Sequence, residues 1–235
     1  METLWWSESD LSIGSVGLAS SERGLARLFL PIERERAEAA LGRAFGRHDL
    51  RADDGRNAEP LRQLEQYLAG ERRAFDLPLD PRGTPFQLAA WRAVAEVGYG
   101  LTATYGQIAR RIGQPQAVRA VGAANGDNPL PIVVPCHRIV GSGGQLTGYG
   151  GGLPLKERLL TLEGALPRAE ESWPDWAARR AAADPGLLIG PRSTRIFCRP
   201  TCRYTSRLGR VPATFASPTE AAQEGYRACR VCHPV

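Results

Sequence analysis

The stretch Asn128-Pro-Leu-Pro-Ile-Val-Val-Pro-Cys-His-Arg-Ile-Val140 organises the centre of this chain. Asn128 and the prolines after it predict a rigid loop, and the β-branched run Ile132–Val134 predicts a buried strand that leads straight into Cys136 and His137. A cysteine in this position is either an inert core thiol or a nucleophile whose thiolate is favoured by the adjacent base. The Cys–His pair alone favours the inert thiol, because a cysteine is unreactive unless its pKa is lowered.

Short helices are predicted immediately before this stretch. Thr104-Tyr-Gly-Gln107 is a capping-box pattern that opens a helix through Ile112, and Gly113 ends it. Gln116–Asn125 can form the next helix. Two short helices separated by a glycine turn are typical of a helix-turn-helix, although an ordinary helical hairpin has the same pattern. A second capping box, Thr84-Pro-Phe-Gln87, begins an earlier helix.

The first third of the chain has the pattern of a small α/β unit. Leu11–Leu18 and Gly24–Leu30 alternate with a period of two and predict a hairpin. Helix-like segments follow at Glu33–Phe45 and Pro60–Leu68, with Asp49–Asn57 as a polar loop between them. No catalytic constellation is evident in this third, so we expect it to support the rest of the chain.

Charge is distributed unevenly along the chain. The net charge of +5 divides into −3 for residues 1–79, +3 for residues 80–166, −1 for residues 167–186 and +6 for residues 187–235. Two basic segments are typical of a protein that contacts phosphates. A preference for arginine explains the use of one lysine beside 29 arginines, but it does not explain the scarcity of acids after residue 187.

Composition excludes several classes of protein. No stretch approaches the run of about 20 apolar residues that spans a bilayer, and the N-terminus lacks the pattern of a signal peptide. Five cysteines, all in the last hundred residues, form an odd and clustered set, which argues against a secreted disulfide framework. We therefore expect a cytoplasmic protein without a membrane partner.

Four of the five cysteines have the spacing of metal ligands. Cys198-x3-Cys202 is followed after 26 residues by Cys229-x2-Cys232, which predicts a zinc site with four thiolate ligands. Such a site usually holds together a module too small for a good core. Together these patterns predict an α/β unit at 1–79, a helical domain with Cys136 at 80–166, a linker and short helix at 167–186, and the zinc module at 187–235.

The central segment resembles the O6-alkylguanine-DNA alkyltransferases. The resemblance is strong over about residues 80–164, and it rests on six ordered segments: Phe86–Trp91, Thr104–Ala109, Arg119–Gly122, Pro135–Arg138 preceded by Asn128-Pro129, Gly148-Tyr149 and Leu159–Gly164. It is weaker over residues 1–79, where length and element order match better than residues. The fold that it implies is an α/β ribonuclease-H-like N-terminal subdomain plus a mostly α helix-turn-helix alkyltransferase domain.

The resemblance also implies roles for individual residues. Cys136 would attack the alkyl group of O6-alkylguanine, or of O4-alkylthymine, without a cofactor, and His137 would act as a base through a water, oriented by Glu163. The nucleotide would be flipped out of the duplex, with Arg119 filling the gap. Tyr105 would donate a proton to the departing guanine, and Asn128 would brace the active-site loop.

Further residues follow from the same resemblance. DNA contacts would come from Tyr105, Arg119, Ala120, Gly122, Ala123, Ala124 and Arg138. The substrate pocket would be lined by Ile139, Tyr149 and Gly150. Gly150 and Gly151 stand where related proteins often carry a larger residue, so we expect a roomier pocket.

The C-terminal cysteines resemble the zinc domain of Ada, which removes methyl groups from DNA phosphotriesters. The segments Arg195–Arg203 and Gly225–His233 carry this resemblance. It implies a small zinc-bound α+β module in which Cys198 is both a ligand of one Zn²⁺ and a methyl acceptor. Candidate phosphate contacts are Arg199, Arg203, Arg207, Arg227 and Arg230. Ada's zinc domain precedes a transcription-activator module, whereas here the zinc module comes last, so we expect no transcriptional activation.

Two other functions fit parts of the sequence. One is a DNA-binding protein, either a protein that flags lesions or a regulator with a purely structural zinc module. Lesion-flagging proteins lack the acceptor cysteine, whereas Cys136 is present. A Cys–His hydrolase would need an oxyanion hole that is not evident, and it would leave the helix-turn-helix unexplained. We therefore expect a single-use DNA-repair alkyltransferase, monomeric, whose partner is double-stranded DNA containing alkylated bases or methylphosphotriesters.

Overall fold

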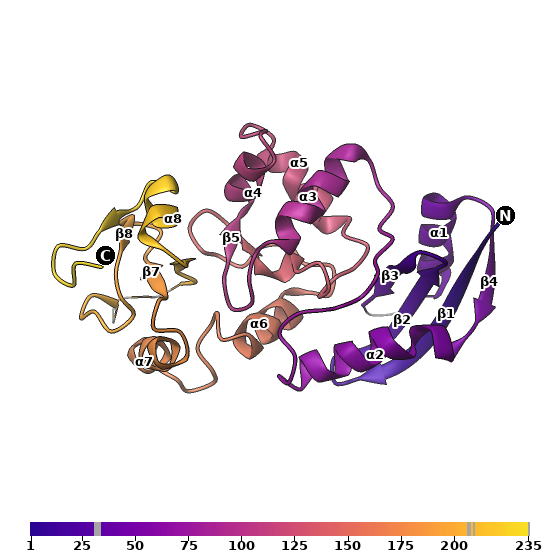
Figure 1. Cartoon of the computed structure of the whole chain (residues 1–235), viewed down its shortest axis with the longest axis horizontal. Helices are drawn as coiled ribbons and strands as arrows, with labels where there is room; N and C mark the ends of the chain where they lie inside the picture. The colour runs from indigo at the N-terminus through magenta and orange to yellow at the C-terminus, as the bar shows by residue number, and fades with distance from the viewer. Residues whose placement is uncertain (31–33, 206–207, 209, 235) are drawn as a thin grey trace.

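The computed structural model describes residues 1–30, 34–205, 208 and 210–234. Three parts follow one another along the long axis of the molecule: an N-terminal sheet with two helices, a central helical domain, and a small C-terminal module (Figure 1). Among the described residues, every helix is too short or too polar to cross a bilayer.

The N-terminal part is built on a four-stranded sheet. Its strands are β1 (Glu2–Leu11), β2 (Gly14–Ser21), β3 (Gly24–Phe29) and β4 (His48–Ala52), in the order β3-β2-β1-β4. β1 pairs with β2 in the antiparallel sense and with β4 in the parallel sense. The helices are α1 (Arg34–Phe45) and α2 (Asp54–Leu68). Leu41 of α1 packs with Leu4, while Tyr67 of α2 packs with Val16, so the helices cover opposite faces of the sheet.

The predicted pairing of two strands is confirmed, with a tighter turn at Glu22-Arg23. The first strand runs over Gly14–Ser21 and not Leu11–Leu18, because Ser12-Ile13 form the turn that follows β1. The strand β1 was not predicted. The polar loop expected at Asp49–Asn57 is wrong, because this segment contains β4 and the first turn of α2. Backbone pairing with β1 makes the polar segment a strand, and Asp53 caps α2 by accepting a hydrogen bond from the backbone of Arg56, so Pro60 lies inside the helix.

The central domain contains the predicted helices. Its elements are α3 (Pro85–Ala95), β5 (Ala103–Thr104), α4 (Tyr105–Arg111), α5 (Val118–Gly126), the 3-10 turn η1 (Cys136–Arg138), β6 (Ile139–Val140) and α6 (Leu153–Leu162). Both predicted capping boxes are present, at Thr84 with Gln87 and at Thr104 with Gln107. Gly113 adopts a φ of +73° between α4 and α5, as a turn of this kind requires.

The strand predicted at Ile132–Val134 is wrong. The segment is a turn closed by an isolated bridge between Pro131 and Val134, and Ile132 has a φ of 74°. Prolines on both sides remove backbone donors, so no ladder can form there. The loop instead accepts a hydrogen bond at Pro129 from the backbone N–H of Leu28 in β3, at 2.9 Å.

The C-terminal part begins with α7 (Trp173–Ala183). The elements after it are β7 (Leu188–Gly190), β8 (Ile196–Phe197), β9 (Ala213–Phe215), α8 (Pro218–Gln223) and β10 (Arg227–Ala228). β7 pairs with β9 in the antiparallel sense and β8 pairs with β10 in the parallel sense. Phe197 and Phe215 occupy a small core, so cysteine ligands are the natural reinforcement of this module.

Candidate active site and metal centre

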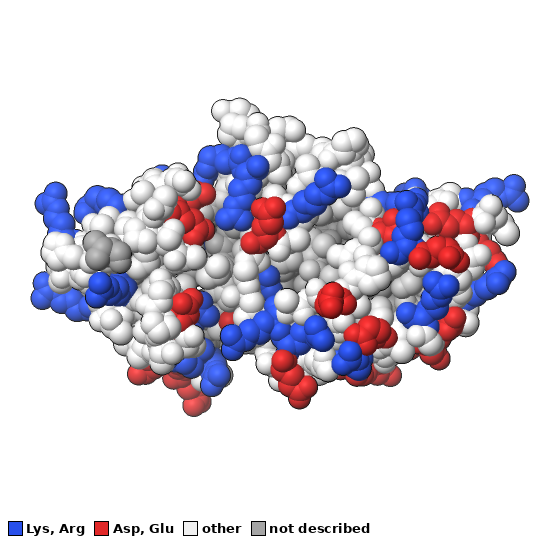
Figure 2. Space-filling view, in the orientation of Figure 1, with Lys and Arg blue, Asp and Glu red and all other residues white. Residues whose placement is uncertain are grey.

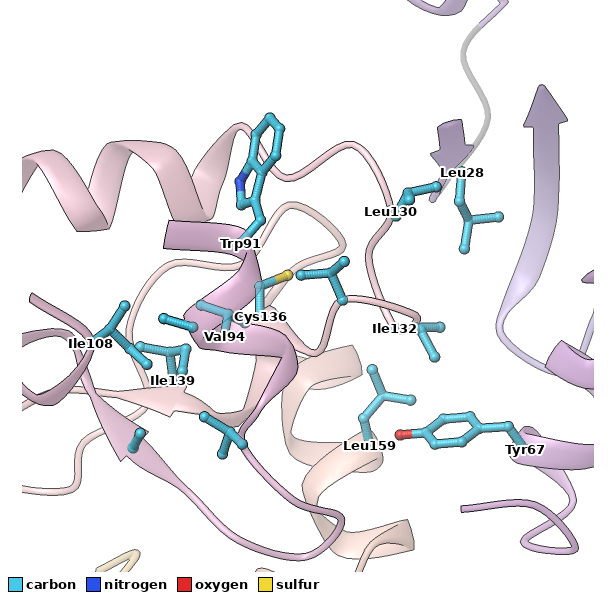
Figure 3. Packing of buried hydrophobic residues seen from close by; sticks show 14 of the residues in the cluster. Leu28, Tyr67, Trp91, Val94, Ile108, Leu130, Ile132, Cys136, Ile139 and Leu159 are labelled. Atoms are coloured by element: carbon cyan, nitrogen blue, oxygen red, sulfur yellow. The ribbon is translucent and has the colours of Figure 1, made fainter. Parts of the chain in front are cut away.

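Cys136 lies in the core of the central domain. Its side chain is buried among residues of α3, including Trp91 and Val94 (Figure 3). Its backbone N–H donates to the carbonyl of Val134 at 2.8 Å, which closes the turn before η1. The Asn128 side chain donates to the same carbonyl at 2.8 Å and accepts from the Leu130 N–H at 3.1 Å. Asn128 therefore ties together the loop that presents the thiol.

Glu163 is the centre of a buried network beside the thiol. Its carboxylate accepts from His137 Nε2 at 2.9 Å and from the Tyr67 hydroxyl at 2.5 Å. Arg138 Nη2 donates to it at 2.8 Å, and the backbone N–H of Gly100 donates at 3.2 Å. The side chains of His137 and Glu163 are fully buried. The sequence brings these groups from α2, the α3–β5 loop, η1 and the end of α6.

The electrostatics of this network leave His137 able to accept a proton. Burial tends to raise the pKa of Glu163, but His137 and Arg138 outweigh it and lower that pKa to about 2. The ionised carboxylate requires a proton on His137 Nε2, so the lone pair lies on Nδ1. Nδ1 has no hydrogen-bond partner among the described residues. Burial lowers the pKa of His137, so its ring is neutral near pH 7.

To act as a nucleophile, the Cys136 thiol would need such a base. Burial raises the pKa of Cys136, while Asn128 and Lys156 act against that rise. Lys156 is itself fully buried, and its ammonium donates to the carbonyls of Ile139 and Thr147. Burial lowers the pKa of Lys156 to about 8. The chain's one lysine was not predicted to belong to the site, because a lysine in a helix with mixed polarity usually points to water.

A hollow of about 380 Å³ opens on Cys136. It is lined by Asn128, Tyr149 and Gly150, together with Arg27 and other residues of the N-terminal part. A Cβ built on Gly150 would meet no atom within 4 Å, consistent with a roomy pocket. Ile139 is fully buried and does not line this hollow, so its place in the substrate pocket is a wrong prediction. Tyr105 lies outside it: its hydroxyl accepts from Thr147 Oγ1 at 3.3 Å, and the ring borders a different hollow.

The expected DNA contacts of α5 fall into two groups. Arg119, Ala120 and Ala123 are exposed and Gly122 is partly exposed. Ala124 is buried, because it lies one turn from Val121 on the face that packs against α3, and its carbonyl accepts from Trp91 Nε1 at 2.7 Å. Ala124 as a surface contact is therefore a wrong prediction.

Arg138 as a DNA contact is also wrong. Its guanidinium is buried and paired with Glu163, and it also donates to the carbonyl of Val97. Nothing in the sequence around Arg138 indicates that its side chain is buried. The network also contains Tyr67, from the third of the chain in which no catalytic group was expected.

The four C-terminal cysteines converge. The ligand atoms of Cys198, Cys202, Cys229 and Cys232 all lie within 4.8 Å of one another. Cys198 follows β8 and Cys229 follows β10, so the pairing of these two strands brings the two halves of the set together. Four thiols at this distance, three of them buried, match the donor set of a structural zinc site. Of the arginines expected near it, Arg207 lies outside the described residues.

Comparison with known proteins agrees with this arrangement. Three family models match: the ribonuclease-like domain of 6-O-methylguanine DNA methyltransferase at residues 6–81, its DNA-binding domain at 85–165, and the metal-binding domain of Ada at 171–235. A methylated-DNA–protein-cysteine methyltransferase of Methanosarcina barkeri is 46% identical over 151 residues, which are 64% of this chain and 91% of that protein. The chain belongs to the methylated-DNA–protein-cysteine methyltransferase family.

Other members of the family support the same conclusion. The Methanosarcina acetivorans enzyme is 57% identical over 107 residues, covering 46% of this chain and 69% of that protein. The crystal structure of Mycobacterium tuberculosis OGT in complex with DNA is similar with a TM-score of 0.58 and 42% identity, covering 68% of this chain and 92% of that one. These similarities confirm the alkyltransferase fold, with an N-terminal sheet subdomain and a helical domain.

Proposed function

We propose that this chain repairs DNA by direct reversal of alkylation, transferring the alkyl group of O6-alkylguanine irreversibly to Cys136. The observation that carries the proposal is the His137–Glu163 pair, which leaves Nδ1 of a neutral imidazole as a proton acceptor in the residue that follows the buried Cys136. The membership of the family and the DNA complex of the M. tuberculosis relative support double-stranded DNA as the partner.

The transfer balances as a single displacement. Cys136 loses its proton to His137 through a water, and its sulfur forms a bond to the alkyl carbon while the bond from that carbon to guanine O6 breaks. In the bound complex Tyr105, which borders the neighbouring hollow, would donate the proton that lets guanine leave as a neutral base, and solvent would restore the Tyr105 proton. The thioether that forms is not hydrolysed readily, so each chain acts once. The same displacement would transfer the alkyl group of O4-alkylthymine to Cys136.

The mechanism also requires the alkylated nucleotide to be positioned at Cys136. The duplex hides the target atom, so the nucleotide flips into the hollow at Cys136, with Tyr149 and Gly150 around the base and Arg119 in the gap. Exposed small residues of α5, Ala120 and Ala123, allow close approach of DNA. The relay residues come from one chain, which supports action as a monomer, and we place this action in the cytoplasm.

We also propose that the C-terminal module holds one Zn²⁺ and that Cys198 is a second acceptor, for methyl groups of DNA phosphotriesters. When bound by the four cysteines, zinc would keep the sulfur of Cys198 as a thiolate. A hollow of about 370 Å³ supports Cys198 in this role, because Cys198 and Cys229 line it whereas Cys202 and Cys232 do not. Arg227 and Arg230 line the same hollow and can receive the phosphate.

Intact-mass measurement tests both acceptors. After incubation with a duplex containing O6-methylguanine, the peptide with Cys136 should gain one methyl group, and Cys136→Ser should gain none. DNA binding with an unchanged mass would show a lesion-binding protein instead. With methylphosphotriester DNA, the methyl group should appear on Cys198. Transfer that persists in Cys198→Ser would leave the zinc module a structural role alone.

A further inference from the structure

Helix α7 lies directly behind the Glu163 network. The side chain of Trp176 is fully buried, and its Nε1 donates to the carbonyl of Gly164 at 2.9 Å. Arg180, also buried, donates from Nη2 to the carbonyl of Gly100 at 3.1 Å. Gly164 is the residue that follows Glu163, and Gly100 is the residue whose N–H binds the Glu163 carboxylate.

Gly100 and Gly164 are closely packed. Gly100 has a φ of +72°, and a Cβ built on it would lie 2.7 Å from Arg180 Nη1 and 2.7 Å from the carbonyl oxygen of Glu163. Gly164 has a φ of +77°, and a Cβ there would lie 3.3 Å from Arg179 Nη1 and 3.4 Å from Arg180 Nη1, both on α7. Both glycines therefore pack directly against α7. Helix α7 belongs to the stretch 171–235, which matches the Ada metal-binding domain and not the alkyltransferase models.

We propose that α7 positions the relay of the other domain, with Trp176 and Arg180 as positioning residues that hold Glu163 against His137. Trp176 fixes the backbone at the end of α6, and Arg180 fixes the Gly100 loop that donates to the carboxylate. The C-terminal half of the chain then has a second task beyond zinc binding, because the rate of transfer to Cys136 depends on it. The inference rests on the proposed function of Cys136.

The test measures the rate of methyl transfer to Cys136 in variants of the full chain. Arg180→Met removes the donor to Gly100, and Trp176→Phe keeps a buried ring but removes the donor to Gly164. A small misplacement of a catalytic group slows a reaction by up to about a hundredfold, so we expect a fall of at least about tenfold in Arg180→Met. Arg180→Lys retains a donor and should restore part of the rate. Arg158→Met, whose parent side chain donates to the carbonyl of Ser12 at 2.6 Å, away from the Glu163 network, is the matched control and should keep the wild-type rate.

The pH dependence of the transfer rate distinguishes a positioning role of α7 from a purely structural role. Loss of Arg180 removes a cation and loosens the Gly100 donor, so Glu163 becomes a stronger acceptor and the pKa of His137 rises. The acid limb of the rate profile should then move to higher pH in Arg180→Met. A wild-type rate and profile in folded Arg180→Met and Trp176→Phe would overturn the proposal, as would an equal loss in Arg158→Met. If Arg180→Met fails to fold, Trp176→Phe and Arg180→Lys decide by the same criteria. A wild-type chain that never methylates Cys136 would instead overturn the proposed function.

A separate hollow of about 540 Å³ lies between the helix-turn-helix and the zinc module. Its polar walls come from both, with Tyr105, Arg110 and Ser142 on one side and Arg192, Arg195 and Tyr226 on the other. Arg110 of α4 forms an ion pair across it with Glu224. Basic side chains appear over both the helical domain and the C-terminal module on the face shown in Figure 2.

We infer that this hollow receives the sugar–phosphate backbone of DNA bound by the helix-turn-helix, so that both modules hold one duplex. Three guanidinium groups outnumber the single carboxylate of Glu224, which suits a polyanion. Val118, beside the proposed DNA contact Arg119, lies on its edge. Arg192 is already held by the carbonyl of Val211 and the hydroxyl of Thr102, whereas Arg195 is exposed.

Binding of an undamaged duplex tests this inference without any transfer chemistry. Fluorescence anisotropy over a series of salt concentrations should show weaker binding by Arg195→Ala and a salt slope reduced by about one. Arg168→Ala removes the same charge from an exposed site outside the hollow and should leave the affinity and slope near those of the wild type. Equal affinity and slope in Arg195→Ala and the wild type would overturn the inference.

Discussion

At Glu163, groups from distant parts of the chain meet on one buried carboxylate. Tyr67, Gly100, His137 and Arg138 all donate to it. An ionised carboxylate without such partners would be too costly to bury. His137 is one of these donors, so the carboxylate also fixes the orientation of its ring, and the stability of the fold and the proposed transfer to Cys136 depend on one set of contacts.

Replacing Tyr67 with phenylalanine should reduce both the stability of the fold and the rate of methyl transfer. The variant loses a hydrogen bond to a charged group, which contributes about 1.5–3 kcal/mol to the free energy of unfolding. Urea denaturation measures this loss, and methyl transfer to Cys136 should slow. Tyr99→Phe is the control, because the Tyr99 hydroxyl donates to a neutral carbonyl of Leu162 at 3.3 Å and should contribute about 0.5–1.5 kcal/mol. Equal stability of Tyr67→Phe and wild type would contradict the role given to this hydrogen bond.

The pH dependence of the transfer should reflect His137. Its neutral form accepts the proton, and burial lowers its pKa below the ordinary value of 6.5. The rate should therefore be half-maximal at a pH below 6.5 and fall further at lower pH, as the ring becomes protonated. Single-turnover rates on O6-methylguanine DNA measured between about pH 5 and pH 8 check this, since His is the group that ordinarily titrates in that range. A half-maximal rate above pH 6.5 would contradict the prediction.

At the scale of elements, the helix-turn-helix depends on one glycine. Gly113 has a φ of +73° and open space around its Cα, so a side chain there meets strain and no collision. Gly113→Ala should lower the free energy of unfolding by about 1–2 kcal/mol, the cost of a left-handed alanine. The control is Gly126→Ala, which is helical and equally open and should stabilise by up to about 1 kcal/mol. Thermal unfolding distinguishes them, and a neutral Gly113→Ala would show that the turn relaxes.

At the scale of the whole molecule, we expect the C-terminal module to depend on a metal ion held by its four cysteines. Its apolar core is small, and binding of a structural zinc contributes on the order of 10 kcal/mol to folding of such modules. Native mass spectrometry should find one zinc per chain, and a chelator should increase hydrogen exchange in β7–β10. Cys202→Ser should reduce zinc retention, whereas Cys136→Ser should not alter it. A zinc-depleted chain with unchanged exchange would contradict the requirement for metal.

The sequence by itself determined the features that depend on residues close together in the chain. Capping boxes at Thr84 and Thr104 and the turn at Gly113 depend on residues a few positions apart, and the structure contains all three. The zinc ligands could be found in the same way, because thiolate spacing reflects the reach of a short loop. Cys136, His137 and Glu163 were found through motifs, and the structure brings His137 and Glu163 into contact.

Only the tertiary structure decided which side chains are inside and what they meet. β4 is a strand because β1 lies beside it, and Ile132–Val134 is a turn because flanking prolines and the contact with β3 prevail over local preference. Arg138, Lys156 and Tyr67 are internal because Glu163 and two backbone carbonyls offer them partners. Such partners come from residues far apart in the sequence, so burial of a polar group is a property of the packed chain, which no local pattern records.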